Sequence, residues 1–227
     1  MSNPIILSID PKLLRTDERI IHAAIKVFAD FSLEKATLAI IAKEAGITLS
    51  SITYYFKTKE KLYGEVLNRI LDYMLDDINR RIAELDAMSE NALTPEVAEI
   101  NLRDLFRHFV GRLFDSGSAL FVRILIREQS APSVFYNDIY ERYFKRVIHL
   151  LERLIGVITG CKEKHRLSML AFSAFAQIIG SRLEKYLLLK HSGIEEFSAD
   201  DIEQIEMIIT ENAMLIVKQE HFLYTVT

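Results

Sequence analysis

Residues 37–56 read TLAIIAKEAGITLSSITYYF, and they predict two short helices joined by a tight turn. Thr37 and Thr48 each precede an apolar helical run, where a threonine hydroxyl can cap free backbone N–H groups. Gly46 follows the first run and supplies the left-handed conformation that such a turn requires. Ala42 is small, so the two helices can cross closely. The stretch therefore predicts a helix-turn-helix, whose second helix enters the major groove of DNA.

The second of these helices would present side chains that suit a DNA groove. Most of them are small or carry a hydroxyl group that can bond base edges or phosphates, and a leucine can contact thymine methyl groups. Tyr55 and Lys59 are placed to hold the DNA backbone, which fixes register without reading sequence. The residues predicted to contact DNA are Thr37, Thr48, Leu49, Ser50, Ser51, Thr53, Tyr54, Tyr55 and Lys59. The alternative is a compact three-helix core that only looks like this motif.

Helical periodicity continues on both sides of the motif, and no strand pattern is convincing. Residues 16–31 predict the first helix, and a long helix is predicted to start at Lys59. Further helices are predicted near 95–115, 118–129, 133–159, 163–191 and 199–222, which gives about nine in all. The predicted fold class is all-α, with an N-terminal three-helix helix-turn-helix DNA-binding domain followed by a larger helical ligand-binding and dimerisation domain.

Three parts are predicted along the chain. Residues 1–15 form a flexible N-terminal arm, residues 16–62 the helix-turn-helix domain, and residues 63–227 the ligand-binding and dimerisation domain. The net charge of the chain is −4, yet its first 62 residues hold nine Lys and Arg against seven Asp and Glu. A weak positive charge thus lies at the end that would meet DNA.

The composition indicates a helical protein with a sizeable core. Half of the 227 residues are hydrophobic, and only 8 Gly and 4 Pro interrupt them. Charged residues interrupt each long apolar run well before about 18 residues, which predicts no transmembrane helix. The N-terminus lacks the basic start and apolar run of a signal peptide, and Cys161 is the single cysteine, so a cytoplasmic protein is predicted.

No pattern in the sequence favours an enzyme. The six histidines are scattered, and neither a phosphate-binding glycine loop nor a pair of acidic residues stands out. Cys161 and His165 are four residues apart, but two ligands make a poor metal site. We therefore expect no catalytic residue, no cofactor and no metal.

Residues 16–67 resemble the DNA-binding domain of the TetR/AcrR family of transcriptional regulators. The shared positions are Ile21 to Phe31, Thr37-Leu38, Ile41-Ala42, Ala45-Gly46-Ile47, Tyr54-Tyr55-Phe56 and Lys59-Glu60-Lys61-Leu62. Residues 49–56 (LSSITYYF) and 126–135 (IREQSAPSVF) resemble the CecR-like branch, which extends the likeness over most of the chain. Ser32 and Leu33 depart from the usual Gly-aromatic pair after the first helix, and the outward face of the recognition helix lacks Arg and Lys. We therefore assign no relative's operator sequence to this chain.

The resemblance implies a homodimeric repressor that binds a palindromic DNA operator. A protein that recognises a two-fold symmetric operator must be a dimer, because the two half-sites lie about 34 Å apart. The resemblance places the interface in the last two long helices, which are apolar around much of their circumference. The predicted interface residues are Phe175, Ile178, Ile179, Leu183, Ile205, Ile209 and Ile216. An ordinary monomer core is the alternative for these apolar faces.

The resemblance also implies a small-molecule effector that wedges the body and swings the fourth helix. An aromatic cavity with a few polar groups suits such a sensor. The predicted ligand-binding residues are Phe106, Phe109, Phe121, Arg123, Arg127, Tyr140 and Phe172. The alternative is core packing, with Arg127 and Glu128 paired or capping a neighbouring helix.

A second hypothesis for the function is a helical carrier of a lipid or another small molecule, with a vestigial head. Residues 48–59 separate the two hypotheses. A carrier has no use for Thr48, Tyr55 and Lys59 as an exposed polar set, whereas a DNA-binding protein needs them.

Overall fold

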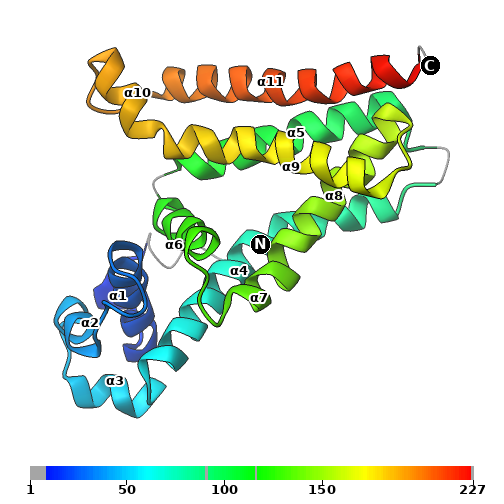
Figure 1. Ribbon diagram of the computed structural model, residues 1–227. Helices are drawn as coiled ribbons and strands as arrows, with labels where there is room; N and C mark the ends of the chain where they lie inside the picture. Colours follow the sequence, from blue (N-terminus) through cyan, green and yellow to red (C-terminus); the bar gives the residue numbers. More distant parts are fainter. Residues whose placement is uncertain (1–8, 90–91, 116, 226–227) are drawn as a thin grey trace. The chain divides into compact units, whose positions relative to one another are not determined.

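The computed structural model describes residues 9–89, 92–115 and 117–225, and these residues form helices without any strand. The helices are α1 (Thr16–Asp30), α2 (Leu38–Ala45), α3 (Leu49–Phe56), α4 (Lys59–Asp86), α5 (Pro95–Phe114), α6 (Ala119–Ser130), α7 (Tyr136–Ile139), the π-helix η3 (Tyr140–Phe144), α8 (Lys145–Thr159), α9 (Lys164–Leu183), α10 (Lys185–Ser192) and α11 (Ala199–Thr225) (Figure 1). No helix within these ranges is both long and apolar enough to cross a membrane. The all-α prediction is confirmed. Of the predicted arm, residues 1–8 lie outside the described residues, and Pro11–Leu13 forms the short 3-10 helix η2.

The chain forms two compact units. The first contains α1 to α3, α4 as far as Asn79, and the segment of α6, α7 and η3 up to Phe144. The second contains the end of α4 from Arg80, together with α5 and α8 to α11. These units differ from the predicted division between residues 62 and 63, because α6 packs against α1 and so joins the first unit.

The helix-turn-helix forms because its turns and caps are specified locally. The Thr37 hydroxyl oxygen accepts a hydrogen bond from the Ile40 N–H at 3.2 Å, and that of Thr48 accepts one from the Ser51 N–H at 3.3 Å. These bonds cap α2 and α3 as predicted. Gly46 ends α2 with φ 64°, in the left-handed region that a side chain disfavours.

A small apolar core fixes these helices to one another. Ile25 and Phe28 of α1, Ile41 of α2 and Ile52 of α3 are all fully buried, and α1 packs against both α2 and α3. Burying each of these side chains contributes roughly 1.5–3 kcal/mol. Because α3 is fixed through Ile52 on its inner side, its opposite side is free to face a partner.

We expect the stability of this core to depend on pH through His22, which lies within it. It is only 5 % exposed, and burial, assisted by the nearby Lys26 ammonium, lowers its pKa below 6.5. The unfolded chain therefore binds more protons below pH 6.5, so the free energy of unfolding is expected to fall as the pH drops through that range. Urea denaturation of the native chain and of His22→Gln at pH 7.5 and pH 5.5 checks this. An equal loss of stability in both proteins on acidification would contradict it.

The second unit is built around α5, which contacts α8, α9 and α11. Its buried surface includes Phe109 of α5, whose ring meets that of Phe175 of α9 edge-on with centroids 5.6 Å apart. The predicted helix over 163–191 is divided between α9 and α10 at Glu184. Neither Gly nor Pro occupies this break, so the sequence pattern carried no sign of it.

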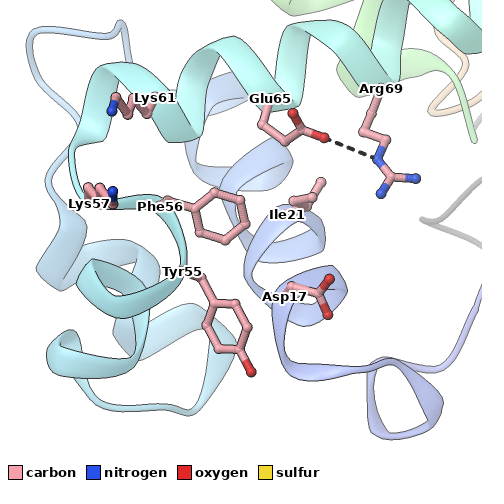
Figure 2. A pocket seen from close by; sticks show the side chains of 8 residues that line it. All are labelled: Asp17, Ile21, Tyr55, Phe56, Lys57, Lys61, Glu65 and Arg69. Atoms are coloured by element: carbon pink, nitrogen blue, oxygen red, sulfur yellow. Dashed lines mark ion pairs between the residues drawn. The ribbon is translucent and has the colours of Figure 1, made fainter.

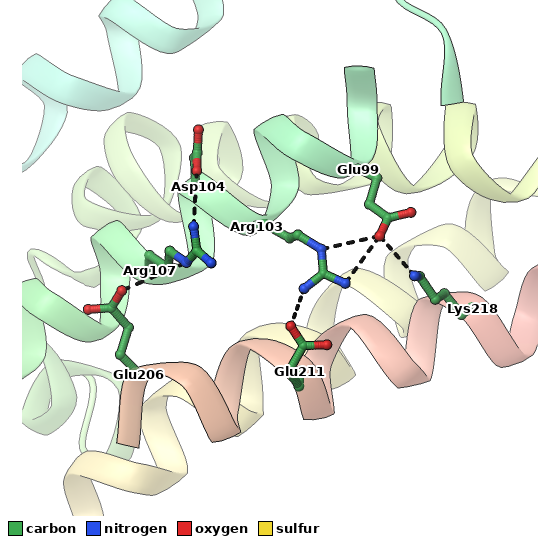
Figure 3. A network of polar contacts seen from close by, with 7 residues as sticks. All are labelled: Glu99, Arg103, Asp104, Arg107, Glu206, Glu211 and Lys218. Carbon is green, nitrogen blue, oxygen red and sulfur yellow. Dashed lines mark hydrogen bonds and ion pairs between the residues drawn. The ribbon is translucent and has the colours of Figure 1, made fainter. Parts of the chain in front are cut away.

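Charged side chains join α11 to α5 along one flank (Figure 3). Arg103 of α5 contacts Glu99, 3.1 Å away on the same helix, and pairs with Glu211 of α11. Lys218 of α11 reaches back to Glu99 at 2.8 Å. The hydrogen bonds from Lys218 and Arg103 hold the pKa of the Glu99 carboxyl below its usual range, against a smaller opposing effect of burial. The network flanks the apolar contact between the two helices, in which Ala213, Met214 and Val217 of α11 are buried.

Candidate nucleic-acid interface

Helix α3 turns most of its predicted DNA-contacting residues outward, while Ser51 is half-buried. Tyr54 is 80 % exposed and Leu49 49 % exposed, and Ser50 and Thr53 are also exposed. Thr37, at the start of α2, is exposed as well. The surface is therefore mostly hydroxyl groups with two larger side chains, and it carries no charge that would repel phosphate.

Short local bonds orient the hydroxyl groups on this surface. The Thr48 Oγ1 atom lies 2.9 Å from the Oγ atoms of Ser50 and Ser51, and the Thr53 hydroxyl donates to the Ser50 carbonyl at 3.0 Å. A hydroxyl has one donor hydrogen and two acceptor lone pairs. Thr48 Oγ1 also accepts from the Ser51 N–H, so its three positions are used locally. The Thr53 hydroxyl donates locally and keeps acceptor lone pairs for a base edge or a phosphate-bound water.

Lys59 is engaged within the protein. Its ammonium donates to the carbonyl oxygens of Ala36 at 3.0 Å and Glu34 at 3.3 Å, in the loop between α1 and α2. It therefore ties the start of α4 to that loop, next to the cap of α2. The predicted contact between Lys59 and the DNA backbone stays a prediction, since it would have to use the remaining donor hydrogen or break these bonds.

Lys57 is a cationic residue that the sequence prediction left out. It is exposed and lies between α3 and α4 with φ 61° and ψ −54°. The Thr58 N–H donates to the Phe56 carbonyl at 2.7 Å across it, which makes a γ-turn of the strained type with positive φ. Among the described residues, Lys57 is the non-glycine residue with positive φ. Its signal in the sequence was a lysine directly after the recognition helix.

Relief of this strain can be measured separately from loss of charge. Lys57→Gly and Lys57→Ala remove the same charge, and only glycine adopts positive φ at little cost. We expect the glycine variant to be more stable than the alanine variant by about 1 kcal/mol, in denaturant titrations followed by circular dichroism. Both variants should bind DNA equally, and more weakly than the native chain. An alanine variant as stable as the glycine variant would contradict the claim that the backbone at Lys57 is strained.

An open hollow of about 410 Å³ adjoins the end of α3 (Figure 2). It is lined by Asp17, Ile21, Tyr55, Phe56, Lys57, Lys61, Glu65 and Arg69. Tyr55 and Asp17 lie on one side of it, and the Glu65–Arg69 ion pair, 3.6 Å long, on the other. Because acidic and basic groups are mixed in its lining, the hollow does not define the charge of a ligand.

The predicted ligand-binding residues are divided between the two units. Phe121, Arg123, Arg127 and Tyr140 belong to the first unit, and Phe106, Phe109 and Phe172 to the second. Arg123 is exposed and pairs with Asp30 at 2.9 Å. The Arg127 guanidinium donates to three carbonyls at the end of α1. It therefore caps a neighbouring helix, which was the alternative to ligand binding. Binding of a ligand by these residues stays a prediction.

The predicted interface residues face both inward and outward. Ile178 is fully buried and Ile209 is 9 % exposed within the chain's own packing, and their place at an interface stays a prediction. Leu183 is exposed, and Phe175, Ile179, Ile205 and Ile216 are half-buried. On α9 and on α11 as far as residue 219, the large apolar side chains that face outward are Met169, Phe172, Leu183, Met207, Ile208 and Leu215.

Two segments of the chain match known protein families. A family model for bacterial regulatory proteins of the tetR family matches residues 20–66. A model for the C-terminal domain of the HTH-type transcriptional dual regulator CecR matches residues 98–218. The chain is 26 % identical over 206 residues to the HTH-type transcriptional dual regulator CecR of Shigella flexneri, a match that covers 88 % of this chain and 91 % of that protein.

Solved structures share the fold. A TetR-like transcriptional regulator from Rhodococcus sp. RHA1 matches with a TM-score of 0.63 at 17 % identity, covering 89 % of this chain and 96 % of that one. The transcriptional regulator FadR from Bacillus subtilis, solved in complex with stearoyl-CoA, matches with a TM-score of 0.58 at 18 % identity, covering 86 % and 96 %. These likenesses extend over both units, beyond the helix-turn-helix alone.

Proposed function

Because the chain belongs to the tetR family of bacterial regulatory proteins and carries the C-terminal domain of the CecR regulators, it is a DNA-binding transcriptional regulator, and we propose that it acts as a homodimeric repressor. Its operator is a palindrome, and a small-molecule ligand releases it. The observation that carries this proposal is the outward face of α3, which is hydroxyl-rich and exposed while Ile52 anchors the helix in a buried core.

The dimer is supported by an apolar stripe on α9. Met169, Phe172 and Leu183 project from one side of that helix, at spacings that keep them in line. On α11, which packs beside α9, Ile208 and Leu215 lie two turns apart and face outward. Exposed apolar side chains gathered on two neighbouring helices favour an interaction site, and a second copy of the same chain offers the same side chains in return.

Titration of the purified protein against the DNA upstream of its own coding sequence tests the proposal. We expect tight binding that survives scrambled competitor DNA and that weakens steeply with salt, because each phosphate contact releases counterions. Binding no tighter than to scrambled DNA, here and across a genomic selection, would favour the carrier hypothesis. Addition of stearoyl-CoA, the ligand of the Bacillus FadR complex, and of a panel of small metabolites to the protein–DNA complex tests the release.

A further inference from the structure

Helix α11 turns one narrow row of side chains outward, which we call the α11 stripe. Its members follow one another at alternating intervals of three and four residues, and they are Ile205, Ile208, Asn212, Leu215 and Gln219. Ile208 is 55 % exposed and Leu215 is 56 % exposed. This spacing is that of the seam along which two helices of a coiled coil pack. It favours a further helix as the occupant of the stripe.

The charges at the ends of α9 and α11 favour a second copy of this chain as that occupant. The two helices pack together and run in opposite directions (Figure 1). Lys164 and Arg166 are exposed at the start of α9, where Glu163 is bonded to backbone N–H groups, and Asp200 and Glu203 are exposed at the start of α11. A two-fold axis across the stripe reverses the partner's helices, so the acidic start of its α11 comes to the same end as the basic start of this α9. Opposite charges thus meet when two copies pair.

Asn212 is the polar residue in the middle of the α11 stripe. It is exposed, and thirteen residues of α11 lie on each side of it. The neighbouring charges of Glu211 and Lys218 are paired with α5 of the same chain (Figure 3). The Asn212 amide, in contrast, makes no hydrogen bond to the part of the chain that the structure describes. An amide within an apolar seam weakens the seam unless the opposite helix offers it a partner.

We propose that Asn212 lies on the two-fold axis of the dimer and bonds to the same amide of the second copy. An amide has both N–H donors and a carbonyl acceptor, so two of them related by a two-fold axis bond reciprocally. In this register Ile208 of each copy lies opposite Leu215 of the other.

The bond between the two amides selects the register and the partner. If the helices slide by one step of the α11 stripe, Asn212 comes to lie opposite Ile208 or Leu215, and its amide is buried without a partner. A chain with an apolar residue at this place is disfavoured as a partner for the same reason. This inference rests on the proposed function, and it names the residue that determines the specificity of the proposed dimer.

Disulfide cross-linking tests the position of the axis. Asn212→Cys and its control Gln219→Cys are each made together with Cys161→Ser, which removes the single native cysteine. Gln219 is exposed on the same stripe, about 10 Å further along α11, so its two copies would lie roughly 20 Å apart. A disulfide needs Cα atoms within about 7 Å. We expect mild oxidation to join two copies of the Asn212→Cys chain and not of the Gln219→Cys chain on a non-reducing gel.

Subunit exchange tests the selection of the partner and keeps Cys161 in place. Tagged native protein is mixed with untagged Asn212→Leu, or with untagged native protein as the reference, and the mixed dimers are captured and counted. Because a mixed pair leaves one amide without a partner, we expect roughly 10-fold fewer mixed dimers than in the reference. The Asn212→Leu chain paired with itself should be at least as stable a dimer as the native chain.

Three results would overturn the inference. The first is a native dimer whose Asn212→Cys variant does not cross-link, the second is cross-linking of Gln219→Cys as readily as of Asn212→Cys, and the third is exchange of Asn212→Leu in the same proportion as the reference. A native chain that sediments as a monomer would overturn the proposed homodimer and the inference with it, which separates that outcome from the other three.

Discussion

Replacing Tyr54 with glutamate is expected to lower operator affinity by roughly 100-fold or more, because a lost base or phosphate contact costs about 1–3 kcal/mol and each dimer carries two copies of the change. The new carboxylate also repels the DNA phosphates. Tyr54 is 80 % exposed and contributes little to the core, so the melting temperature should stay within about 2 °C of that of the native protein. Fluorescence anisotropy with labelled operator and a thermal melt measure the two quantities.

The control for this variant is Lys162→Gln. It also lowers the net charge by one, and Lys162 is an exposed residue between α8 and α9, in the second unit. It should bind operator almost as the native protein does. Native affinity in Tyr54→Glu, or a loss of the same size in Lys162→Gln, would show that α3 does not enter the groove as proposed.

The double variant Phe172→Asp/Ile208→Asp is expected to be a monomer at micromolar concentration and to lose operator binding almost completely. Phe172 is 67 % exposed on α9 and Ile208 55 % exposed on α11. Across a two-fold interface each new carboxylate appears twice and would be buried without a partner, at a cost of several kcal/mol. Sedimentation velocity and operator titration follow the two effects.

A substitution in the core, Ile178→Val, is the control for the dimer prediction. Ile178→Val removes one methyl group from a fully buried side chain, so it should lower stability by about 1 kcal/mol and leave the dimer intact. If Phe172→Asp/Ile208→Asp remains a dimer, the outward stripe on α9 and α11 is not the interface.

The features that were predicted best from the sequence are those determined by residues close together in the chain. Thr37, Thr48 and Gly46 determine caps and a turn within a few residues of themselves, and the structure shows each of them in its predicted role. Family resemblance supplied the class of protein. The strained turn at Lys57 was missed because a lysine there carries no mark of positive φ.

Features that depend on distant parts of the chain could not be predicted. Lys59 is bound by carbonyls more than twenty residues earlier in the chain, and Arg127 by carbonyls almost a hundred residues earlier. Both are cations that, from sequence alone, suggested contacts with phosphate or ligand. On α9, apolar residues lie all around the helix, so the sequence could not tell that Ile178 faces the core while Phe172 faces outward.

Selection of random double-stranded DNA by the purified native protein tests the central claim most directly. We predict that the enriched sequences converge on a palindrome with two half-sites about one helical turn apart, one for each α3 of a dimer. We also predict that Tyr54→Glu enriches no sequence under the same conditions. A native protein that enriches nothing, or one whose Tyr54→Glu variant enriches the same palindrome, would contradict the account.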